Sequence, residues 1–361
     1  MKGLRSANIV ALGSALWVLA CQSEGALVAA DAGHRAADGV AARSVTPPVV
    51  TVTSLGTLDH CAGGTLAFGI NPAGQVAGQC YTNASIYHGF LWDAGEITDL
   101  GTLGGTVSLA WAINPAGQVV GWSTTSTGYT HAFLWDEGVM IDLGTLAAGL
   151  SSYAYGIDPA GQVVGGSYTN AFAAYHAFLW DYGVMTDLGT LGGTYSEARG
   201  INPSGQVVGS STTSNGEQHA VLWQKGVMND LGTLGGKSSV ALAINPSAQV
   251  VGYIITSTGA YHAFFWQKGV MTDLGTLGGP NSTALAINPA GQVVGVSNTT
   301  AGNFEKDHGF LWYKGVMTDL GPLAAGANSY ASSINPGGQV VGYSRAVASG
   351  SDGSALMWTV K

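Results

Sequence analysis

The chain has 361 residues, 56 of them glycine, and a formal net charge of −9 at pH 7. Its glycines follow no G-X-Y period, and its 10 Trp and 14 Tyr residues can build a core, which excludes collagen and a disordered chain. An acidic chain with no cluster of Lys and Arg lacks the basic surface that nucleic-acid binding needs, and beyond residue 20 no apolar run approaches the roughly 20 residues of a membrane-spanning helix.

Residues 1–21 have the pattern of an export signal. Lys2 and Arg5 precede the apolar run IVALGSALWVLA, which ends just before Cys21. The tetrapeptide Val18-Leu19-Ala20-Cys21 resembles a bacterial lipobox, in which the cysteine is acylated and becomes the new N-terminus. Acylation of Cys21 is therefore expected, with an anchor in the outer membrane or at the cell surface. A plain secretory signal and a secreted protein are the alternative.

Residues 22–48 follow as an Ala/Gly-rich segment of mixed charge that ends in Thr46-Pro47-Pro48. Such a composition predicts a flexible tether between the anchor and the body of the protein. The protein is then expected to meet a membrane only through its lipid. The fold has to be sought in the remaining residues, 49–361.

An internal repeat organises residues 49–361. The segment I-[N/D]-P-x-[G/A]-Q-V occurs seven times, with its Asn or Asp at positions 71, 114, 158, 202, 245, 288 and 335. Asn/Asp-Pro-x-Gly suits a type I turn followed by glycine at positive φ, and the later Asp-x-Gly fits the same pattern. Each unit therefore predicts four short antiparallel strands, in the third unit at 152–157, 162–168, 176–180 and 184–189. Ala248 replaces the turn glycine of the fifth unit, where it is either strained at positive φ or changes the turn.

Four-stranded units repeated every ~40–50 residues are the signature of a β-propeller. The body begins with VVTVTSLGTL (49–58), which matches a fourth strand, and ends with SALMWTVK (354–361), which matches a third strand. The N-terminal strand can thus complete the last unit and close the ring, which removes open sheet edges. We predict an all-β, seven-bladed β-propeller that is closed by this strand and is monomeric.

The repeat also resembles that of a known family. His-Ala-Phe at the start of the third strand, together with L-G-T-L-G-G and I-N-P-x-G-Q, is similar to the HAF repeat of bacterial extracellular proteins. The resemblance covers residues 49–361. It implies an exported repeat protein and no particular activity.

A histidine, a tryptophan and an aspartate recur in step with the repeat. Equivalent residues on adjacent blades should lie more than ~10 Å apart, whereas zinc binds histidine nitrogens at ~2.0–2.1 Å. No second His, Cys or carboxylate is expected beside each histidine, so no metal, cofactor or catalytic array is predicted. The histidines are expected to bond to a neighbouring loop, the aspartates to cap backbone N–H groups, and the tryptophans to pack between blades. The histidines are His88, His131, His176, His219, His262 and His308, and the aspartates are Asp99, Asp142, Asp187, Asp230, Asp273 and Asp319.

Function is sought where the units differ, in the loops between the second and third strands. These loops are rich in Tyr, Asn, Ser, Thr and Gly, the mixture found in binding loops. We therefore predict a non-catalytic protein that recognises a neutral carbohydrate polymer or a protein surface, multivalently where several loops take part. The alternative is that the loops are merely small and polar. The predicted ligand-binding tyrosines are Tyr81, Tyr87, Tyr129, Tyr168, Tyr175 and Tyr261.

Two further classes stay open. A structural or adhesive surface protein needs no defined ligand. A hydrolase or lyase needs polar residues that break the repeat near the channel mouth, and the candidates are Asp59-His60, Glu197 with Arg199, and Glu305-Lys306-Asp307. No nucleophile motif, Walker loop or His-x-x-x-His pair accompanies them, so no enzyme is expected.

Cys61 and Cys80 remain once Cys21 carries the lipid, an even number in an oxidising compartment. They lie on either side of one predicted hairpin, so a disulfide between them is predicted. Two unpaired cysteines are the alternative.

Overall fold

The computed structural model describes residues 50–56, 64–82, 86–146, 150–169, 174–299, 306–324, 326–345 and 353–360. Contacts divide the chain into a unit Met1–Pro47 and a unit Pro48–Lys361, and every described residue lies in the second unit. The predicted signal segment and the tether, with Cys21, therefore lie outside the described residues. None of the described helical structure is long and apolar enough to cross a membrane.

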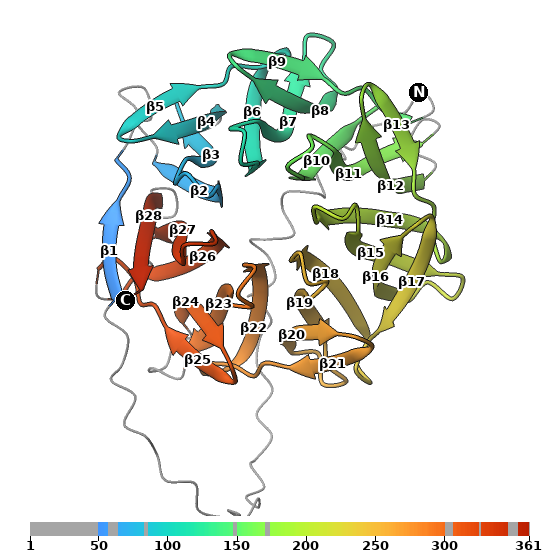
Figure 1. Cartoon of the computed structure of the whole chain (residues 1–361), viewed down its shortest axis with the longest axis vertical. Helices are drawn as coiled ribbons and strands as arrows, with labels where there is room; N and C mark the ends of the chain where they lie inside the picture. Colours follow the sequence, from blue (N-terminus) through green and yellow to red (C-terminus); the bar gives the residue numbers. More distant parts are fainter. Residues whose placement is uncertain are drawn as a thin grey trace, which may run out of the picture. The chain divides into compact units, whose positions relative to one another are not determined.

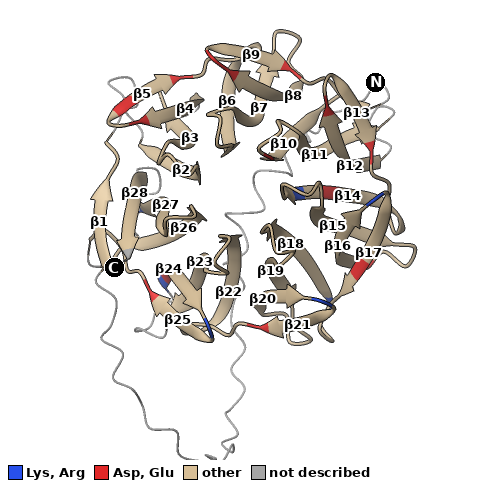
Figure 2. Cartoon of the chain, in the orientation of Figure 1, with Lys and Arg blue, Asp and Glu red and all other residues tan. Residues whose placement is uncertain are grey.

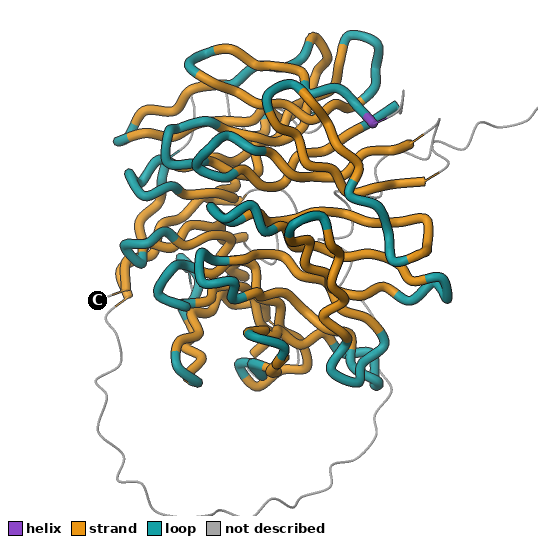
Figure 3. The backbone as a smooth tube through the Cα atoms, turned by 45° about the vertical axis from the view of Figure 1, so that its right-hand side comes forward, coloured by secondary structure: helices purple, strands orange, loops and turns teal. Residues whose placement is uncertain are grey.

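The described residues form 28 β-strands and no α-helix, and strands make up most of the tube in Figure 3. They pair into five separate four-stranded sheets and one eight-stranded sheet. The eight-stranded sheet consists of two four-stranded meanders that a single parallel bridge, Tyr175 to Tyr195, links. We number these four-stranded units as sheets 1 to 7 in the order in which their innermost strands occur in the chain.

Sheet 1 holds β2 (Thr65–Ile70), β3 (Val76–Tyr81), β4 (Tyr87–Asp93) and β5 (Glu96–Asp99). Sheet 2 holds β6 (Gly104–Ile113), β7 (Val119–Thr125), β8 (Thr130–Asp136) and β9 (Val139–Asp142). Sheet 3 holds β10 (Ser152–Ile157), β11 (Val163–Thr169), β12 (Ala174–Asp181) and β13 (Val184–Asp187). Sheet 4 holds β14 (Gly192–Ile201), β15 (Val207–Thr213), β16 (Gln218–Gln224) and β17 (Val227–Gly232).

Sheet 5 holds β18 (Ser238–Ile244), β19 (Val250–Ile255), β20 (Tyr261–Gln267) and β21 (Val270–Asp273). Sheet 6 holds β22 (Gly278–Ile287), β23 (Val293–Thr299), β24 (Lys306–Tyr313) and β25 (Val316–Asp319). Sheet 7 holds β26 (Asn328–Ile334), β27 (Gln339–Arg345) and β28 (Gly353–Val360) from the end of the chain, and β1 (Val50–Ser54) pairs with β28 as its outermost strand.

The first turn of each sheet has the geometry that its sequence predicts. In sheet 1 the N–H of Gly74 donates to the carbonyl oxygen of Asn71 at 3.0 Å, and Gly74 has a φ of 88°. The side-chain oxygen of Asn71 accepts from the N–H groups of Ala73 and Gln75, both at 3.0 Å, which fixes the turn locally. Ala248 keeps the same turn in sheet 5 at a φ of 56°, so the alanine is strained and the turn is unchanged.

The second turn differs from the predicted one. Its two central residues both have positive φ, as at Tyr182 (45°) and Gly183 (88°). This is the two-residue connection of a type I′ hairpin, whose twist matches that of the flanking strands, rather than a type I turn followed by glycine. The expectation that both turns share one pattern is therefore wrong.

Each innermost strand carries a β-bulge, which the sequence pattern did not reveal. In sheet 3 the register between β10 and β11 shifts between Ala154 and Gly156, which leaves Tyr155 as the extra residue. On the paired strand, a side chain at Gly165 would collide with the carbonyl oxygen of Tyr153, which explains the glycine of the repeated V-V-G. The bulged positions are Phe68, Trp111, Tyr155, Arg199, Leu242, Leu285 and Ser332.

The core lies between neighbouring sheets. Between sheets 2 and 3, for example, Leu134 and Ala132 pack with Ala154 and Phe178, and Phe178 is fully buried. Each sheet packs its innermost strand against the sheet before it, as β10 packs against β6, β7 and β8. Figure 1 shows the sheets of this unit following one another around a common centre, with their innermost strands nearest to it. Strand β2 of sheet 1 packs in the same way against β26, β27 and β28.

Candidate functional site

The six recurring histidines are bonded to the six recurring aspartates. In sheet 2 the Nδ1 of His131, on β8, lies 2.8 Å from the Oδ2 of Asp142, at the end of β9. The same pair occurs in sheets 1, 3, 4, 5 and 6 at 2.6–2.8 Å. Each histidine therefore has a carboxylate beside it, and the hydrogen bond of its Nδ1 goes to the adjacent strand of its own sheet instead of to a neighbouring loop, so both of those expectations are wrong. The pairs could not be predicted from the sequence because the two residues are eleven apart and meet only through the pairing of two strands.

The recurring aspartates also cap the backbone, as expected. The Oδ1 of Asp142 accepts a hydrogen bond from the N–H of Gly144 at 2.8 Å, and Asp187 does the same for Gly189 at 2.7 Å. The aspartate side chains are 37–48% exposed, so each pair contributes at most about 1 kcal/mol. In the part of the chain that the structure describes, no group of three or more His, Cys, Asp and Glu residues could hold a metal ion.

The predicted binding tyrosines occupy strands more than loops. Tyr81, Tyr87, Tyr168, Tyr175 and Tyr261 all lie within strands and are half-buried, and only Tyr129, between β7 and β8, is exposed, at 42%. The expectation of six tyrosines standing on loops is therefore wrong for five of them. The strands extend farther into the connections than the sequence suggested, so these side chains alternate toward neighbouring strands and sheets.

Two of these tyrosines contact the following sheet. The ring of Tyr87 lies edge-on against Trp122 of sheet 2, with centroids 5.9 Å apart. Tyr175 stacks on Tyr195 of sheet 4, with centroids 5.4 Å apart. Burial, with the neighbouring tyrosines, raises the pKa of Tyr87 to about 12. These rings contribute to packing between sheets.

A first polar cluster, the Glu197 cluster, consists of Tyr155, Tyr175, Tyr195, Glu197 and Arg199. The Nε of Arg199 donates to the Oε2 of Glu197 at 2.6 Å, and the hydroxyl of Tyr175 donates to its Oε1 at 3.4 Å. The guanidinium carbon of Arg199 lies 4.1 Å from the centre of the Tyr155 ring. The side chains of Arg199 and Glu197 are 15% and 5% exposed, so the ion pair is largely removed from water.

Electrostatics bind the Glu197 cluster together. Burial alone would lower the pKa of Arg199, but Glu197 and the tyrosine hydroxyls raise it above its ordinary value. Burial raises the pKa of Tyr155, Tyr175 and Tyr195 well above the usual range, and Glu197 adds to this. Both carboxylate oxygens of Glu197, which was a candidate for catalysis, thus accept hydrogen bonds from Arg199 and Tyr175. Of the other residues considered for catalysis, Asp59, His60 and Glu305 lie outside the described residues, whereas Lys306 and Asp307 lie on β24.

A second polar cluster, the Asp307 cluster, consists of Asn298, Asp307, Tyr330, Tyr343 and Arg345. The Oδ2 of Asp307 accepts from the hydroxyl of Tyr330 at 2.6 Å, and its Oδ1 accepts from the Nδ2 of Asn298 at 2.7 Å. Tyr330 stacks on Tyr343 with centroids 4.7 Å apart, and Arg345 lies 5.2 Å from the centre of the Tyr343 ring. Burial raises the pKa of Tyr343 to about 12, with Arg345 opposing the rise.

The Asp307 cluster contains polar atoms that no hydrogen bond satisfies. The Oδ1 of Asn298 and the Nε of Arg345 are both buried and have no partner in the described structure. Asn298 as a residue is 3% exposed. A buried acceptor and a buried donor therefore lie beside a stacked pair of tyrosines.

The two clusters occupy equivalent junctions between sheets. In both, the residue before the recurring histidine of one sheet contacts the residue five before the turn Asn of the next: Tyr175 bonds to Glu197, and Asp307 bonds to Tyr330. Glu197, Arg199 and Asp307 were predicted as breaks in the repeat, whereas Tyr330, Tyr343, Asn298 and Arg345 were not. Comparing the units position by position would have shown them, because Leu, Val or Thr stands at the position of Tyr330 in four of the other sheets.

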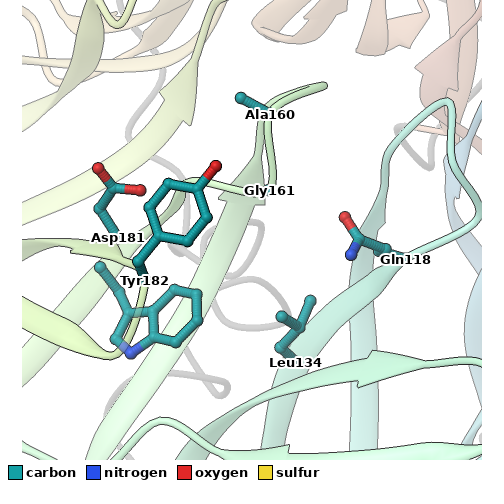
Figure 4. Close-up of a pocket in the computed structure, with 7 residues that line it drawn as sticks. Gln118, Leu134, Ala160, Gly161, Asp181 and Tyr182 are labelled. Carbon is teal, nitrogen blue, oxygen red and sulfur yellow. The ribbon is translucent and has the colours of Figure 1, made fainter.

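A shallow cavity lies between sheets 2 and 3 at the opposite end, where the tight turns are. It has a volume of about 170 Å³, and Figure 4 shows the side chains around it. Tyr182, at the tip of the second turn of sheet 3, is 89% exposed beside it. The lining residues are Gln118, Leu134, Ala160, Gly161, Trp180, Asp181 and Tyr182.

No model of a protein family matches this sequence, and no curated protein matches it. Solved structures do resemble the fold. A structure described in a study of two prolyl endopeptidases has a TM-score of 0.54 at 10% identity, and covers 83% of this chain and 51% of that one. A puromycin-hydrolysing peptidase from Mycobacterium tuberculosis has a TM-score of 0.51 at 14% identity, and covers 84% of this chain and 53% of that one. These neighbours are β-propeller proteins. The fold is that of a β-propeller.

TolB from Acinetobacter baumannii is also similar, with a TM-score of 0.46 at 16% identity over 73% of this chain and 63% of its own. The propeller described here spans about half to two thirds of the length of these three proteins. At such identities the likeness establishes the architecture alone. Within this propeller, the recurring His and Asp residues pair neighbouring strands, and Glu197, Arg199 and Asp307, which depart from the repeat, lie in the two clusters.

Cys80 lies on β3, is 1% exposed and is disulfide-bonded. Cys61 lies outside the described residues, so its pairing with Cys80 stays a prediction.

Proposed function

We propose that this chain is an exported, non-catalytic binding protein that recognises a neutral carbohydrate polymer at the Asp307 cluster. The proposed scaffold is a seven-bladed propeller closed by its N-terminal strand. Support for closure comes from the pairing of β1 with β28 and from the packing of β2 against sheet 7. The observation that carries the binding role is the pair of unpartnered buried atoms, Asn298 Oδ1 and Arg345 Nε.

Unpartnered buried polar groups are costly, at about 1–3 kcal/mol each, so a ligand that bonds to them recovers that free energy. A sugar hydroxyl both donates, as Asn298 requires, and accepts, as Arg345 requires. Asn298 and Asp307 flank the connection between the second and third strands of sheet 6, the kind of loop to which the sequence assigned recognition.

The experiment is a glycan and protein array probed with the purified chain and with two variants. Asn298 and Arg345 stand at the strand position that Thr124 occupies in sheet 2 and Thr212 occupies in sheet 4. Asn298→Thr and Arg345→Thr thus introduce a residue that this position already holds in other sheets. Both variants should therefore fold, which an unchanged melting temperature would establish. We expect the parent chain to bind to polysaccharide spots on the array and both variants to show no binding at those spots. An array on which the parent binds no glycan, or on which both variants bind as the parent does, overturns the proposal. Binding to protein spots alone would assign recognition to a protein surface.

Export and lipid anchoring are part of the proposal and rest on the first 21 residues. We expect the chain to enter the detergent phase on Triton X-114 partition and Cys21→Ala to leave it. A parent chain that stays in the aqueous phase would instead indicate a secreted protein. The resemblance to HAF-repeat proteins stays a prediction that rests on the motifs His-Ala-Phe, L-G-T-L-G-G and I-N-P-x-G-Q.

A further inference from the structure

The second turns of sheets 1 to 6 lie at one end of the sheets, which we call the turn face. Its members are residues 93–96, 136–139, 181–184, 224–227, 267–270 and 313–316. Antiparallel pairing places both tight turns of a sheet at the same end, and in sheet 1 Gln75 of the first turn donates to Asp93 of the second at 2.9 Å. Neighbouring sheets are joined at this end, because the Nδ2 of Asn71 donates to the carbonyl oxygen of Asn114 at 3.1 Å.

Charge on the turn face is divided into two halves. The turns of sheets 1, 2 and 3 carry acidic residues and no basic one, whereas those of sheets 4, 5 and 6 carry lysine and no acidic residue. Because these sheets are neighbours in that order, the charges form two separate blocks, which Figure 2 shows in red and blue along the second turns. The acidic residues are Asp93, Glu96, Asp136, Glu137 and Asp181, and the basic residues are Lys225, Lys268 and Lys314.

Within one chain, Asp93, Asp136 and Asp181 of the acidic block accept hydrogen bonds from glutamines beside the first turns, whereas the lysines have no partner of opposite charge among the described residues. Lys225, Lys268 and Lys314 are exposed, and none forms an ion pair with a described residue. The middle position of the turn accepts either charge, since Glu137 and Lys225 occupy it at φ values of 46° and 52°. Folding alone would therefore allow the two signs to be mixed around the turn face.

Apolar side chains accompany the charges. The valine that follows each Gly of the turn is 58–64% exposed in sheets 2 to 6, as at Val184 and Val227. Tyr182, between acidic and basic blocks, is 89% exposed. Exposed apolar groups beside charges are what an interface between proteins can bury.

We propose that the turn face docks against the turn face of a second copy of this chain. A two-fold axis that lies in the interface, along the line between the blocks, places the acidic block of each copy over the lysine block of the other. The inference is independent of the proposed ligand site, which lies at the other end of the sheets, and it revises the sequence-based expectation of a monomer.

Exposed ion pairs are individually weak and are screened by salt. The dimer should therefore dissociate as ionic strength rises, and reversal of either block should abolish it. A partner protein that is similarly bipolar would be the alternative occupant, and it would leave the purified chain monomeric.

The test is sedimentation velocity of the full chain in non-ionic detergent, with the chain's own turns exchanged. In the acidic variant the Gln-Lys-Gly and Tyr-Lys-Gly turns of sheets 4 to 6 become Asp-Glu-Gly, as in Gln224→Asp with Lys225→Glu. In the basic variant the Asp-x-Gly turns of sheets 1 to 3 become Gln-Lys-Gly, as in Asp136→Gln with Glu137→Lys. Each exchanged turn occurs elsewhere in the chain at the same position, so both variants should fold. Lys237→Glu, an exposed change outside the turn face, is the matched control.

We expect the parent chain and the Lys237→Glu control to dimerise, and the dimer to weaken about tenfold or more between about 0.05 M and about 0.5 M NaCl. Each charge variant should be monomeric alone, and an equal mixture of the two should again dimerise. A parent chain that is monomeric at low salt overturns the proposal. So does a mixture that stays monomeric, or a pair of variants that dimerise as the parent does.

Discussion

Asp158→Asn should stabilise the protein, because Asp158 interrupts a series of hydrogen bonds between sheets. At six of the seven turn positions, all of them described, the Asn side chain donates to the backbone oxygen of the next turn Asn or Asp, at 3.1–3.3 Å. Asn202, for example, donates to Asn245, and Asn335 donates to Asn71. Asp158 has a carboxylate in place of the amide and cannot donate to Asn202.

The gain follows from the contacts at that turn. The new amide would donate to the Asn202 oxygen, which is worth about 1 kcal/mol. It would also meet the side-chain oxygen of Gln162, as Asn202 meets Gln206 at 2.7 Å. Against this, the bonds that Asp158 accepts from the N–H groups of Ala160 and Gln162, both at 2.9 Å, lose their charge assistance. Because Asp158 is 3% exposed, removing its charge also removes a desolvation cost. The net gain should be about 1 kcal/mol, or roughly 2–4 °C in melting temperature.

Calorimetric melting temperatures of two variants test this reasoning. Asp158→Asn should melt higher than the parent chain, and Asn202→Asp, which removes the same bond from the next sheet, should melt lower by a similar or larger amount. A melting temperature that falls in Asp158→Asn would show that the carboxylate's bonds to the backbone outweigh the missing donation. Equal melting temperatures for all three chains would show that the bonds between turns contribute nothing measurable.

Ala248→Gly should stabilise the chain by about 0.5 kcal/mol, because strain of about 1–2 kcal/mol at a φ of 56° exceeds the cost of glycine's freedom in the unfolded chain; a urea midpoint that does not rise would contradict this. Glu197→Gln should cost about 3 kcal/mol or more by leaving Arg199 buried without its carboxylate, and Arg199→Met added to it should recover part of the lost melting temperature, whereas a tolerated Glu197→Gln would show the pair to be well solvated. The pKa values of Tyr87 and Tyr343 are raised by burial from 10.0 to about 12, so stability should hold below pH 10 and fall above it, because the unfolded chain releases these protons first. Tyrosinate absorbance that rises fully at pH 10 in the folded chain would refute that pH dependence.

The strands and the first turns could be predicted from the sequence because their cause is local. Asn71, Gly74 and their equivalents fix a turn through their own backbone preferences, and the four-strand pattern follows from the spacing of the turns. Ala248 could be identified as a departure from the turn pattern for the same reason, but the structure was needed to decide between strain and a changed turn. Features that depend on which residues face each other across strands were not accessible in this way.

The histidine–aspartate pairs illustrate the limit. His131 and Asp142 meet because Phe133 pairs with Asp142 in the register of β8 and β9, and no spacing rule along one strand reveals this. The bulge that leaves Tyr155 unpaired has the same origin. The tyrosines at strand ends were misplaced because a polar connection between two strands does not show where each strand stops.

The candidate site was predicted only in part. Glu197, Arg199 and Asp307 were recognised as departures from the repeat, but the side chains that surround them come from three different strands. Asn298 faces Asp307 across the pairing of β23 with β24, whereas Tyr330 meets Asp307 through packing of sheet 6 against sheet 7. Such a meeting depends on the arrangement of sheets and not on any motif.

The pairing of β1 with β28 constrains when the chain can finish folding. Thr51 and Thr359, 308 residues apart in the sequence, share one hydrogen bond in that pair. Sheet 7 cannot be assembled until β28 has been synthesised, and until then β1 and β27 both present unpaired edges. Contacts of such large sequence separation form slowly. A chain that loses β28 therefore cannot form sheet 7, since β28 is the partner of both β1 and β27.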